Sequence, residues 1–214
     1  IIPVHVYGNI CNVDAIKKIA DKYNLKVIYD AAHAFGINCN SEGIGSYGDA
    51  SVFSFHATKV YNTIEGGAVV CSSHKMYEKL CNLKNFGIRG EELVAEVGAN
   101  AKMNEFSAIM GLCNLRHIDE NILRRKEKYE LYKKLLDGVE GIRILKNTYA
   151  DNDNYAYLPI VIEDKYGISR DALFEIFRNN NVYVRKYFFP IIPDLECYKG
   201  LFLGNVHNAR YLSK

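Results

Sequence analysis

Short apolar runs alternating with an amphipathic helix constrain the fold of the first 71 residues more than any other feature. The apolar runs are IIPVHVYG (1–8), LKVIYD (25–30), ASVFSF (50–55) and GGAVVC (66–71). Between the first two, NVDAIKKIADKYN (12–24) has the apolar spacing of a helix. Short buried strands bounded by glycines, with a helix between them, predict an α/β domain with a mainly parallel sheet.

The second half of the chain predicts a long helical region followed by a smaller unit. Residues 105–139 read as helix with a break near 118–122, the first half apolar enough to be buried and the second half amphipathic. YAYLPIVIE (155–163), a helix from Ser169 to Asn180 and NVYVRKYF (181–188) then read as strand, helix and strand. We expect a large domain over 1–138 and a small α+β domain over 139–214.

The composition narrows the classes of protein. Twenty-seven basic and 25 acidic residues leave a net charge of only +2, which does not favour nucleic-acid binding. No apolar run approaches the ~20 residues that a membrane-spanning helix needs. The six cysteines form no C-x-x-C pair, which favours free thiols in a reducing cytosol. Because the chain opens on a strand without methionine, we expect a missing N-terminal segment.

Two candidate chemical residues lie at predicted strand ends, where ligands collect in parallel sheets. Asp30 ends one strand, three residues before His33, and this pair could be metal ligands, an acid/base pair, or a cap beside a core histidine. A metal is poorly supported because no further cluster with ligand spacing occurs. Lys59 follows another strand, after Ser54 and His56, and is either a solvated lysine or a reactive amine.

Together these residues match what pyridoxal phosphate needs. A carboxylate such as Asp30 can keep the pyridine nitrogen protonated. A partly desolvated lysine such as Lys59 can attack the aldehyde, and hydroxyl and N–H groups can bind the phosphate. The polar stretch GANAKMNE (98–105) opens a predicted helix, which is either an anion site or simply a capped helix.

Six motifs in order resemble the DegT/StrS family of sugar aminotransferases, which are pyridoxal-phosphate enzymes of fold type I acting on nucleotide-linked keto sugars. The resemblance extends over essentially the whole chain, and its motifs are PVHVYG (3–8), DAAHAFG (30–36), FSFHATK (53–59), TIEGGAVV (63–70), FGIRG (86–90) and GANAKMNE (98–105). It implies a chain that is part of a large cofactor domain with a mainly parallel sheet, plus a truncated small domain.

The resemblance also implies roles for individual residues. Lys59 matches the lysine that binds the cofactor's aldehyde, Asp30 the partner of the pyridine nitrogen, and His33 the residue near the phenolic oxygen. Ser54 matches a phosphate ligand, and Asn100 matches an asparagine that reaches the phosphate from the neighbouring subunit, which implies a homodimer.

The match departs from the family's pattern at both ends of the chain. The family's upstream phosphate loop and its aromatic ring over the cofactor have no counterpart here. Tyr187 is a weak candidate substrate contact, because Ile192 stands where many relatives have a histidine. Glu65, Gly66 and Gly67 match the turn that closes the lysine loop, where we interpret both glycines as needed for backbone fit.

The function expected from this resemblance is amino transfer in the cytoplasm, within lipopolysaccharide or polysaccharide biosynthesis. The donor would be an amino acid, glutamate by analogy, and the acceptor a nucleotide-linked keto sugar, aminated at C4 of a dTDP-linked 4-keto-6-deoxyhexose. One alternative is a related sugar dehydratase, in which histidine replaces the lysine that is present here as Lys59. Another is an incompetent fragment that serves only as a folded or dimerisation core.

Overall fold

The computed structural model describes residues 1–201 and 204–213, and these form two compact units. Unit 1 comprises Ile1–Leu131 together with Lys146–Leu158, and unit 2 comprises Tyr132–Leu145 and the described residues from Pro159 onward. The chain therefore leaves unit 1, returns to it for 13 residues and leaves it again. That returning segment is important for the site.

The elements of unit 1 alternate between short strands and helices. In chain order they are α1 (Val13–Tyr23), β1 (Ile28–Asp30), β2 (Asn38–Cys39), β3 (Glu42–Gly43), β4 (Ala50–Ser54), β5 (Gly67–Cys71), α2 (His74–Leu83), β6 (Ile88–Gly90), β7 (Leu93–Val94) and α3 (Glu105–Leu115). Helix α4 (Ile118–Leu136) begins in unit 1 and ends in unit 2. Unit 2 continues with β8 (Ile142–Ile144), β9 (Ile160–Ile162), α5 (Arg170–Asn179) and α6 (His207–Leu212).

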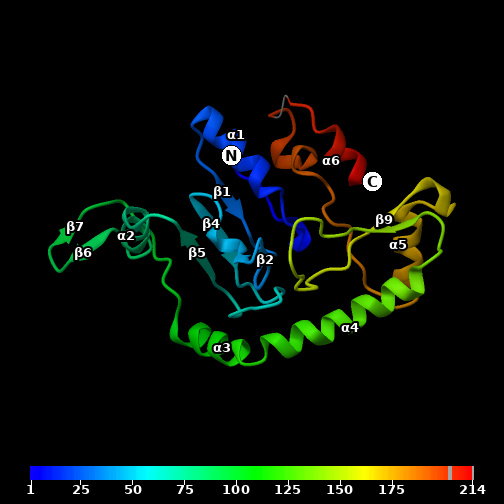
Figure 1. Ribbon diagram of the computed structural model, residues 1–214, viewed down its shortest axis with the longest axis horizontal. Coiled ribbons are helices and arrows are strands. Elements are labelled where there is room, and N and C mark those ends of the chain that lie inside the picture. The colour runs from blue at the N-terminus through cyan, green and yellow to red at the C-terminus, as the bar shows by residue number, and fades with distance from the viewer. Residues whose placement is uncertain (202–203, 214) are drawn as a thin grey trace. The chain divides into compact units, whose positions relative to one another are not determined.

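The sheet of unit 1 has the strand order β1-β4-β5 (Figure 1). Strands β1 and β4 are parallel, whereas β5 is antiparallel to β4. The predicted α/β class is confirmed, with a sheet that is parallel only in part. Strand β5 reverses direction because the loop between β4 and β5 holds no crossover helix, and such a helix is the usual way to join parallel strands.

The first apolar run is extended beside β1 for only part of its length. The Asp30 amide donates to the Pro3 carbonyl at 2.9 Å, and the His5 amide donates to the Asp30 carbonyl at 2.9 Å. The chain then enters a 3-10 turn, Val6–Gly8, in which Tyr7 and Gly8 have positive φ of 60° and 88°. The strand predicted for residues 1–8 is therefore only partly correct.

Helix α1 begins and ends where its local sequence predicts. The Asn12 side chain accepts a hydrogen bond from the Ala15 amide at 2.9 Å, which satisfies one of the unpaired N–H groups of the first turn. Asn24 then ends the helix in the left-handed conformation, at φ 51°. The buried Val13 and Ala20 pack into a core with Val27, Tyr29, Ala31, Ala34, Ile37 and Ile44.

The long helical region breaks at residues 116–117, just before the predicted position, to give α3 and α4. The prediction that its first half is buried is wrong for the single chain. Phe106 is 82% exposed and Leu112 is 63% exposed, while the buried residues of α3 are Ser107 and Gly111. Helix α3 thus packs on unit 1 through its small residues and presents its large apolar ones outward.

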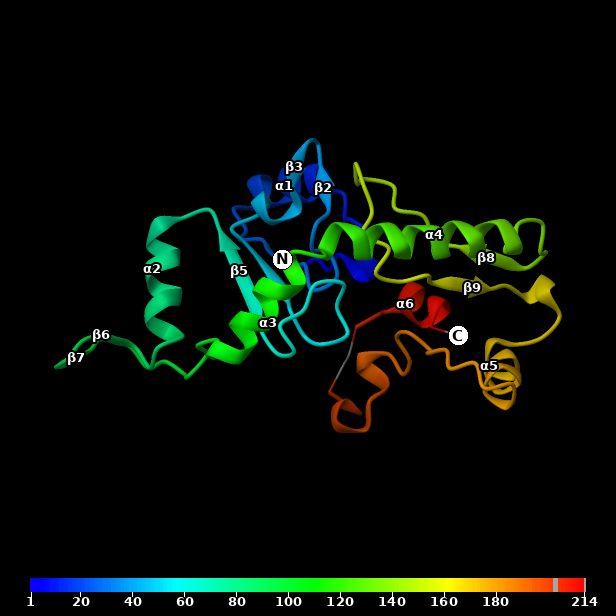
Figure 2. The same ribbon diagram turned by 90° about the horizontal axis from the view of Figure 1, so that it is seen from below.

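Helix α2 and the β6–β7 hairpin form an arm at one extremity of unit 1. In both views the hairpin lies beyond α2, away from the β1-β4-β5 sheet (Figures 1 and 2). Apolar side chains on this arm are also exposed, with Val94 at 66% and Val97 at 99%. In the part of the chain that is described, no helix is both long and apolar enough to cross a membrane.

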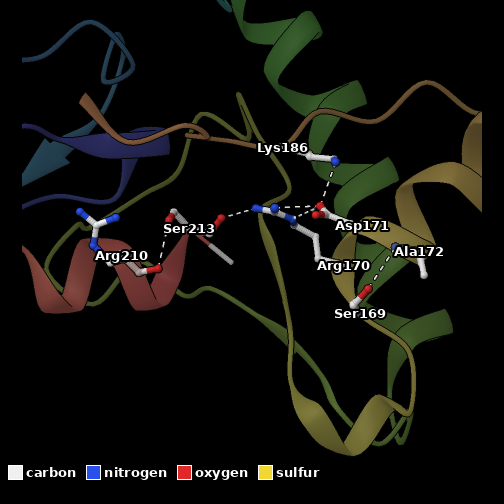
Figure 3. A network of polar contacts seen from close by, with 7 residues as sticks. All are labelled: Ser169, Arg170, Asp171, Ala172, Lys186, Arg210 and Ser213. Atoms are coloured by element: carbon white, nitrogen blue, oxygen red, sulfur yellow. Dashed lines mark hydrogen bonds and ion pairs between the residues drawn. The ribbon is translucent and has the colours of Figure 1, made fainter. Parts of the chain in front are cut away.

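Unit 2 contains the antiparallel pair β8–β9 and helix α5. The helix predicted from Ser169 is confirmed, since the Ser169 hydroxyl accepts a hydrogen bond from the Ala172 amide at 3.2 Å. The strand predicted for residues 181–188 is wrong, because this segment pairs with no strand. Side-chain contacts hold it instead: Lys186 forms an ion pair with Asp171 at 2.8 Å (Figure 3).

The same polar network joins α5 to the end of α6. The Arg170 guanidinium donates to the Ser213 carbonyl and also pairs with Asp171 at 2.8 Å (Figure 3). Its plane lies over the Phe189 ring, with 4.5 Å to the ring centroid. Unit 2 is therefore held at this point by charged and aromatic side chains more than by backbone ladders.

The segment Lys146–Leu158 that returns to unit 1 is rich in asparagine, and we refer to it as the asparagine loop. Its side chains bind the backbone of the first 41 residues. Asn147 bonds Gly8 and Ile10, Asn152 bonds Gly36 and Asn38, and Asp151 bonds Ser41, at 2.6–3.1 Å.

Asn154 is the buried centre of this loop, with no exposed surface. Its amide nitrogen donates to the carbonyls of His33 and Phe35, at 2.9 Å each, and its oxygen accepts from the Ala156 amide at 3.0 Å. Backbone polar groups of a loop need such partners when burial removes them from water.

We predict that Asn154→Ala lowers the free energy of unfolding by about 2–4 kcal/mol, because it removes a fully buried side chain and leaves two part-buried carbonyls without this donor. Asn152→Ala is the matched control, since Asn152 makes equivalent bonds from an exposed position. Urea unfolding of both variants measures the difference. Equal losses for the two variants would contradict the central role of Asn154.

Candidate functional site

The predicted site residues Asp30 and Ser54 lie at the same edge of the sheet. Asp30 is the last residue of β1 and Ser54 the last of β4. In the parallel register Asp30 pairs with Val52, so Ser54 lies two residues further toward the same edge. The Asp30 carboxylate accepts a hydrogen bond from the Ala32 amide at 3.0 Å, which fixes its direction at the strand end.

Lys59 lies in the loop of residues 55–66 that connects β4 to β5, which we refer to as the lysine loop. The base of the loop is closed by two backbone bonds, from the Phe55 amide to the Gly66 carbonyl at 2.8 Å and from the Thr63 amide to the Phe55 carbonyl at 2.9 Å. The Lys59 amide donates to the His56 carbonyl at 2.9 Å in a turn. Lys59 is partly buried, and the next residue, Val60, is buried.

Side chains from two other segments hold the lysine loop. The Phe35 ring stacks on Tyr61 at 4.4 Å between centroids, and both rings meet Phe55, at 5.9 and 4.9 Å. From α3, the Asn114 amide donates to the Asn62 carbonyl at 2.9 Å. The loop is therefore tied both to the segment that follows Asp30 and to α3.

Gly66 and Gly67, which end the lysine loop and begin β5, lie where a side chain would collide with its neighbours. A Cβ on Gly66 would lie 2.3 Å from the Thr63 hydroxyl oxygen, and one on Gly67 would lie 2.7 Å from the Phe53 carbonyl oxygen. Neither position has room for a side chain without movement of these neighbours. The interpretation of these residues as backbone fit agrees with this geometry.

His33 has the most distinctive environment in this region. Its Nδ1 accepts a hydrogen bond from the Tyr7 amide at 2.9 Å, and the Tyr157 ring lies 4.7 Å from its own, between centroids. Burial, and then the charge of Lys59, lower the pKa of His33 to about 4, against the opposing charge of Asp30. The imidazole is therefore neutral at neutral pH, and the charges of Lys59 and Asp30 both act on it.

Tyr7, Asn154 and Tyr157 are neighbours of the site that our sequence analysis did not single out. Tyr7 stands inside the motif PVHVYG, so the motif itself was the available signal. Asn154 and Tyr157 lie more than 100 residues away from His33 and show no local pattern that points to it. Only the returning asparagine loop brings them there.

The remaining predicted residues lie elsewhere in the chain. Asn100 is exposed and follows the β6–β7 hairpin in the chain. Its backbone forms an isolated bridge with Asn85, just after the end of α2. Tyr187 belongs to unit 2 and stacks on Phe188 at 4.8 Å between centroids. Their predicted roles stay predictions.

The chemistry of the described side chains suits an organic cofactor with an aldehyde and a cationic ring. The Asp30 carboxylate and the Ser54 hydroxyl share one sheet edge, and the charges of Asp30 and Lys59 both act on the neutral His33 imidazole. Among the described residues, no three His, Cys, Asp or Glu side chains come together as a metal site would require. All six cysteines are free thiols.

Comparison with known proteins gives a consistent result. The sequence matches the DegT/DnrJ/EryC1/StrS aminotransferase family over residues 1–213. It is 45% identical over 214 residues to the dTDP-4-amino-4,6-dideoxy-D-glucose transaminase of Shigella dysenteriae, covering 100% of this chain and 58% of that protein. The Escherichia coli transaminase of the same name is 42% identical over 211 residues, covering 97% of this chain and 56% of that protein.

Solved structures agree with the fold. The crystal structure of DesI in the presence of its TDP-sugar product superimposes with a TM-score of 0.91 at 34% identity. This match covers 99% of the present chain and 54% of DesI. The chain thus spans a little over half the length of the relatives that it matches.

The lowered pKa of His33 predicts a pH dependence of stability. The pKa of His33 falls from about 6.5 in the unfolded chain to about 4 in the folded chain. Its contribution to the stability of the folded state is therefore fully present above pH 6.5. That stabilisation is lost as pH falls from 6.5 toward 4, because the unfolded state binds the proton first. His5 is also buried, with its pKa lowered to about 4 by burial, and adds to the same window.

Between pH 7 and pH 4.5 the free energy of unfolding should therefore fall less in His33→Gln than in the wild type. Because His5 and His33 contribute similar shares, the substitution should remove roughly half of the fall that the two histidines cause. Urea unfolding at several pH values measures the slope. His117→Gln, on the exposed link between α3 and α4, is the control and should keep the wild-type slope. A wild-type slope for His33→Gln would refute the prediction.

Proposed function

Since the chain belongs to the DegT/DnrJ/EryC1/StrS aminotransferase family, we propose that the protein is a pyridoxal-phosphate-dependent aminotransferase that aminates a nucleotide-linked keto sugar. The observation that carries the proposal is the placement of partly buried Lys59 in the loop after β4, with its charge acting on His33 beside Asp30.

Each side chain has a separate task in this proposal. The cofactor supplies an electron sink for the carbanion that forms next to the transferred nitrogen. The Asp30 carboxylate pairs with the pyridinium nitrogen and keeps it protonated. The Ser54 hydroxyl donates to the phosphate, and His33 donates from its second ring nitrogen to the phenolic oxygen.

Lys59 would hold the cofactor through its aldehyde and would also serve as the acid and base of the transfer. With the cofactor and an amino donor bound, Lys59 would move the proton between the donor's α-carbon and the cofactor. The lysine loop suits this double role, because its base is closed by backbone bonds while Lys59 itself lies in a turn, and the charge of Lys59 acts on His33. We propose glutamate as the donor and the cytoplasm as the location.

The substrate that we propose is a dTDP-linked 4-keto-6-deoxyhexose, aminated at C4. The relatives that share 45% and 42% identity are both named for the product of such a reaction. A relative named GDP-perosamine synthase, from Vibrio cholerae, shares only 29%. Assaying the full-length protein on dTDP- and GDP-linked 4-keto-6-deoxy sugars tests this choice, and a preference for the GDP sugar would overturn it.

The rival functions differ in what Lys59 does. A sugar dehydratase of the same fold would need a histidine in its place, so the presence of Lys59 favours transamination. A fragment that serves only as a folded core would bind no cofactor, whereas a full-length form of the same chain would. Comparing cofactor titrations of the two lengths separates these readings.

We predict that Lys59→Ala abolishes amino transfer, a loss of at least about 10³-fold, while pyridoxamine phosphate still binds. Adding pyridoxal phosphate, reducing with borohydride and mapping the modified peptide by mass spectrometry should place the adduct on Lys59 in the wild type. Exposed Lys79→Ala is the matched control and should keep both activity and adduct. An unlabelled Lys59 in the wild-type full-length protein would sink the proposal.

A homodimer is the assembly that we propose. Large apolar side chains on α3 are exposed in the single chain, and Asn100 lies on the strand-like segment that leads into this helix. A second copy would cover these side chains and receive Asn100 at its phosphate site. Burial of the exposed Phe106 and of two exposed leucines, Leu112 and Leu115, is a strong driving force for such association.

Phe106→Glu should therefore convert the full-length protein from dimer to monomer and weaken cofactor binding. Tyr183→Glu is the matched control, since Phe106 is 82% and Tyr183 81% exposed, but Tyr183 lies in unit 2. Analytical ultracentrifugation reports the mass. A Phe106→Glu protein that stays dimeric would show that α3 is not at the interface.

A further inference from the structure

The asparagine loop places a tyrosine against His33, the histidine that we expect to bind the cofactor. Asn154 donates to the carbonyls of His33 and Phe35, and Tyr157 follows three residues later. The Tyr157 ring lies 4.7 Å from the His33 ring and 5.7 Å from the Tyr7 ring, between centroids. The segment that carries His33 and the ring that contacts it are therefore held by one loop.

Tyr7 makes a second contact with His33, through its backbone amide. The Tyr7 backbone is left-handed, at φ 60°, and directs its amide to His33 Nδ1 at 2.9 Å. The next residue, Gly8, also has positive φ and packs on Asn154, since a Cβ there would lie 3.3 Å from the Asn154 oxygen. The asparagine loop thus supports the contacts that Tyr157 and Tyr7 make with the imidazole.

These contacts select one tautomer of the ring. A nitrogen that accepts a hydrogen bond carries no hydrogen, so in the neutral imidazole the hydrogen is on Nε2. Turning the ring over would exchange the two nitrogens and give up the bond from Tyr7. The Tyr157 ring packs against the imidazole, with 4.7 Å between centroids, and close packing of this kind opposes the rotation.

We propose that Tyr157 is a positioning residue that keeps His33 oriented as an Nε2–H donor to the phenolic oxygen of the cofactor. The identity of the acceptor rests on the proposed function. The charged groups near this ring are Lys59, which disfavours the imidazolium form, and Asp30, which favours it. Tyr157 acts through His33 and takes no part in the reaction itself.

The first test measures the tautomer directly, without the cofactor. Nitrogen-15 NMR of the full-length protein distinguishes Nδ1–H from Nε2–H, and the His33 signals are assigned by their loss in His33→Gln. We expect Nε2–H in the wild type and a mixture of tautomers in Tyr157→Leu. Tyr155→Leu is the matched control, because Tyr155 lies in the same loop but contacts Tyr129, at 5.3 Å between centroids.

The second test measures the binding of pyridoxamine phosphate, which has the same phenolic oxygen but no aldehyde for Lys59. Tyr157→Leu should weaken binding about tenfold, the value of one hydrogen bond to a charged group. In a His33→Ala background the same substitution should cost nothing further, because the two residues act as one unit. A full tenfold loss in that background would overturn the proposal.

The outcomes separate this inference from the proposed function. If the wild type binds no pyridoxamine phosphate, the proposed function and the acceptor fall, and the NMR result alone decides whether Tyr157 positions His33. An unchanged tautomer in Tyr157→Leu overturns the positioning role. If Tyr157→Leu does not fold, Tyr157→Met provides an unbranched apolar side chain that fills the space without a ring.

Discussion

The parallel pairing of β1 with β4 is the interaction on which the rest of the site depends. Parallel neighbours end at the same edge of a sheet, so Asp30 and Ser54 leave it together. The Ala31 amide continues the ladder to the Val52 carbonyl at 2.8 Å, just past the end of β1. A slip of one residue would turn these side chains to the other face and separate the carboxylate from the lysine loop.

Beyond the strands, the site consists of loops, and loops have few backbone partners of their own. Their carbonyls and amides are satisfied by side chains from distant segments. Asn154 serves the segment around His33, and Asn114 of α3 serves the lysine loop. Aromatic rings at 35, 55 and 61 then join the two loops. Precise geometry at a loop-built site requires this kind of support, because backbone entropy otherwise opposes order.

The parts of the fold that were predictable have local causes. Helices α1 and α5 are capped by Asn12 and Ser169, whose side chains accept hydrogen bonds from amides three residues later. The start of each helix therefore depends on residues that are close together in the sequence. The mistaken strand at 181–188 has the right residue types but lacks a partner strand, and a strand exists only when paired. The exposed face of α3 was misjudged because apolar composition cannot tell the core of one chain from a surface that another chain would cover.

The sequence by itself determined the fold class, the order of the motifs and the candidates Asp30, His33, Ser54 and Lys59. Each of these lies within a few residues of a strand end, where short-range patterns carry the information. Only the tertiary structure decided that Asn154 and Tyr157 join His33, across more than 100 residues. Hydrogen bonds from side chains to a distant backbone have no period and no fixed spacing. They arise only once the chain has folded back and brought the two segments together.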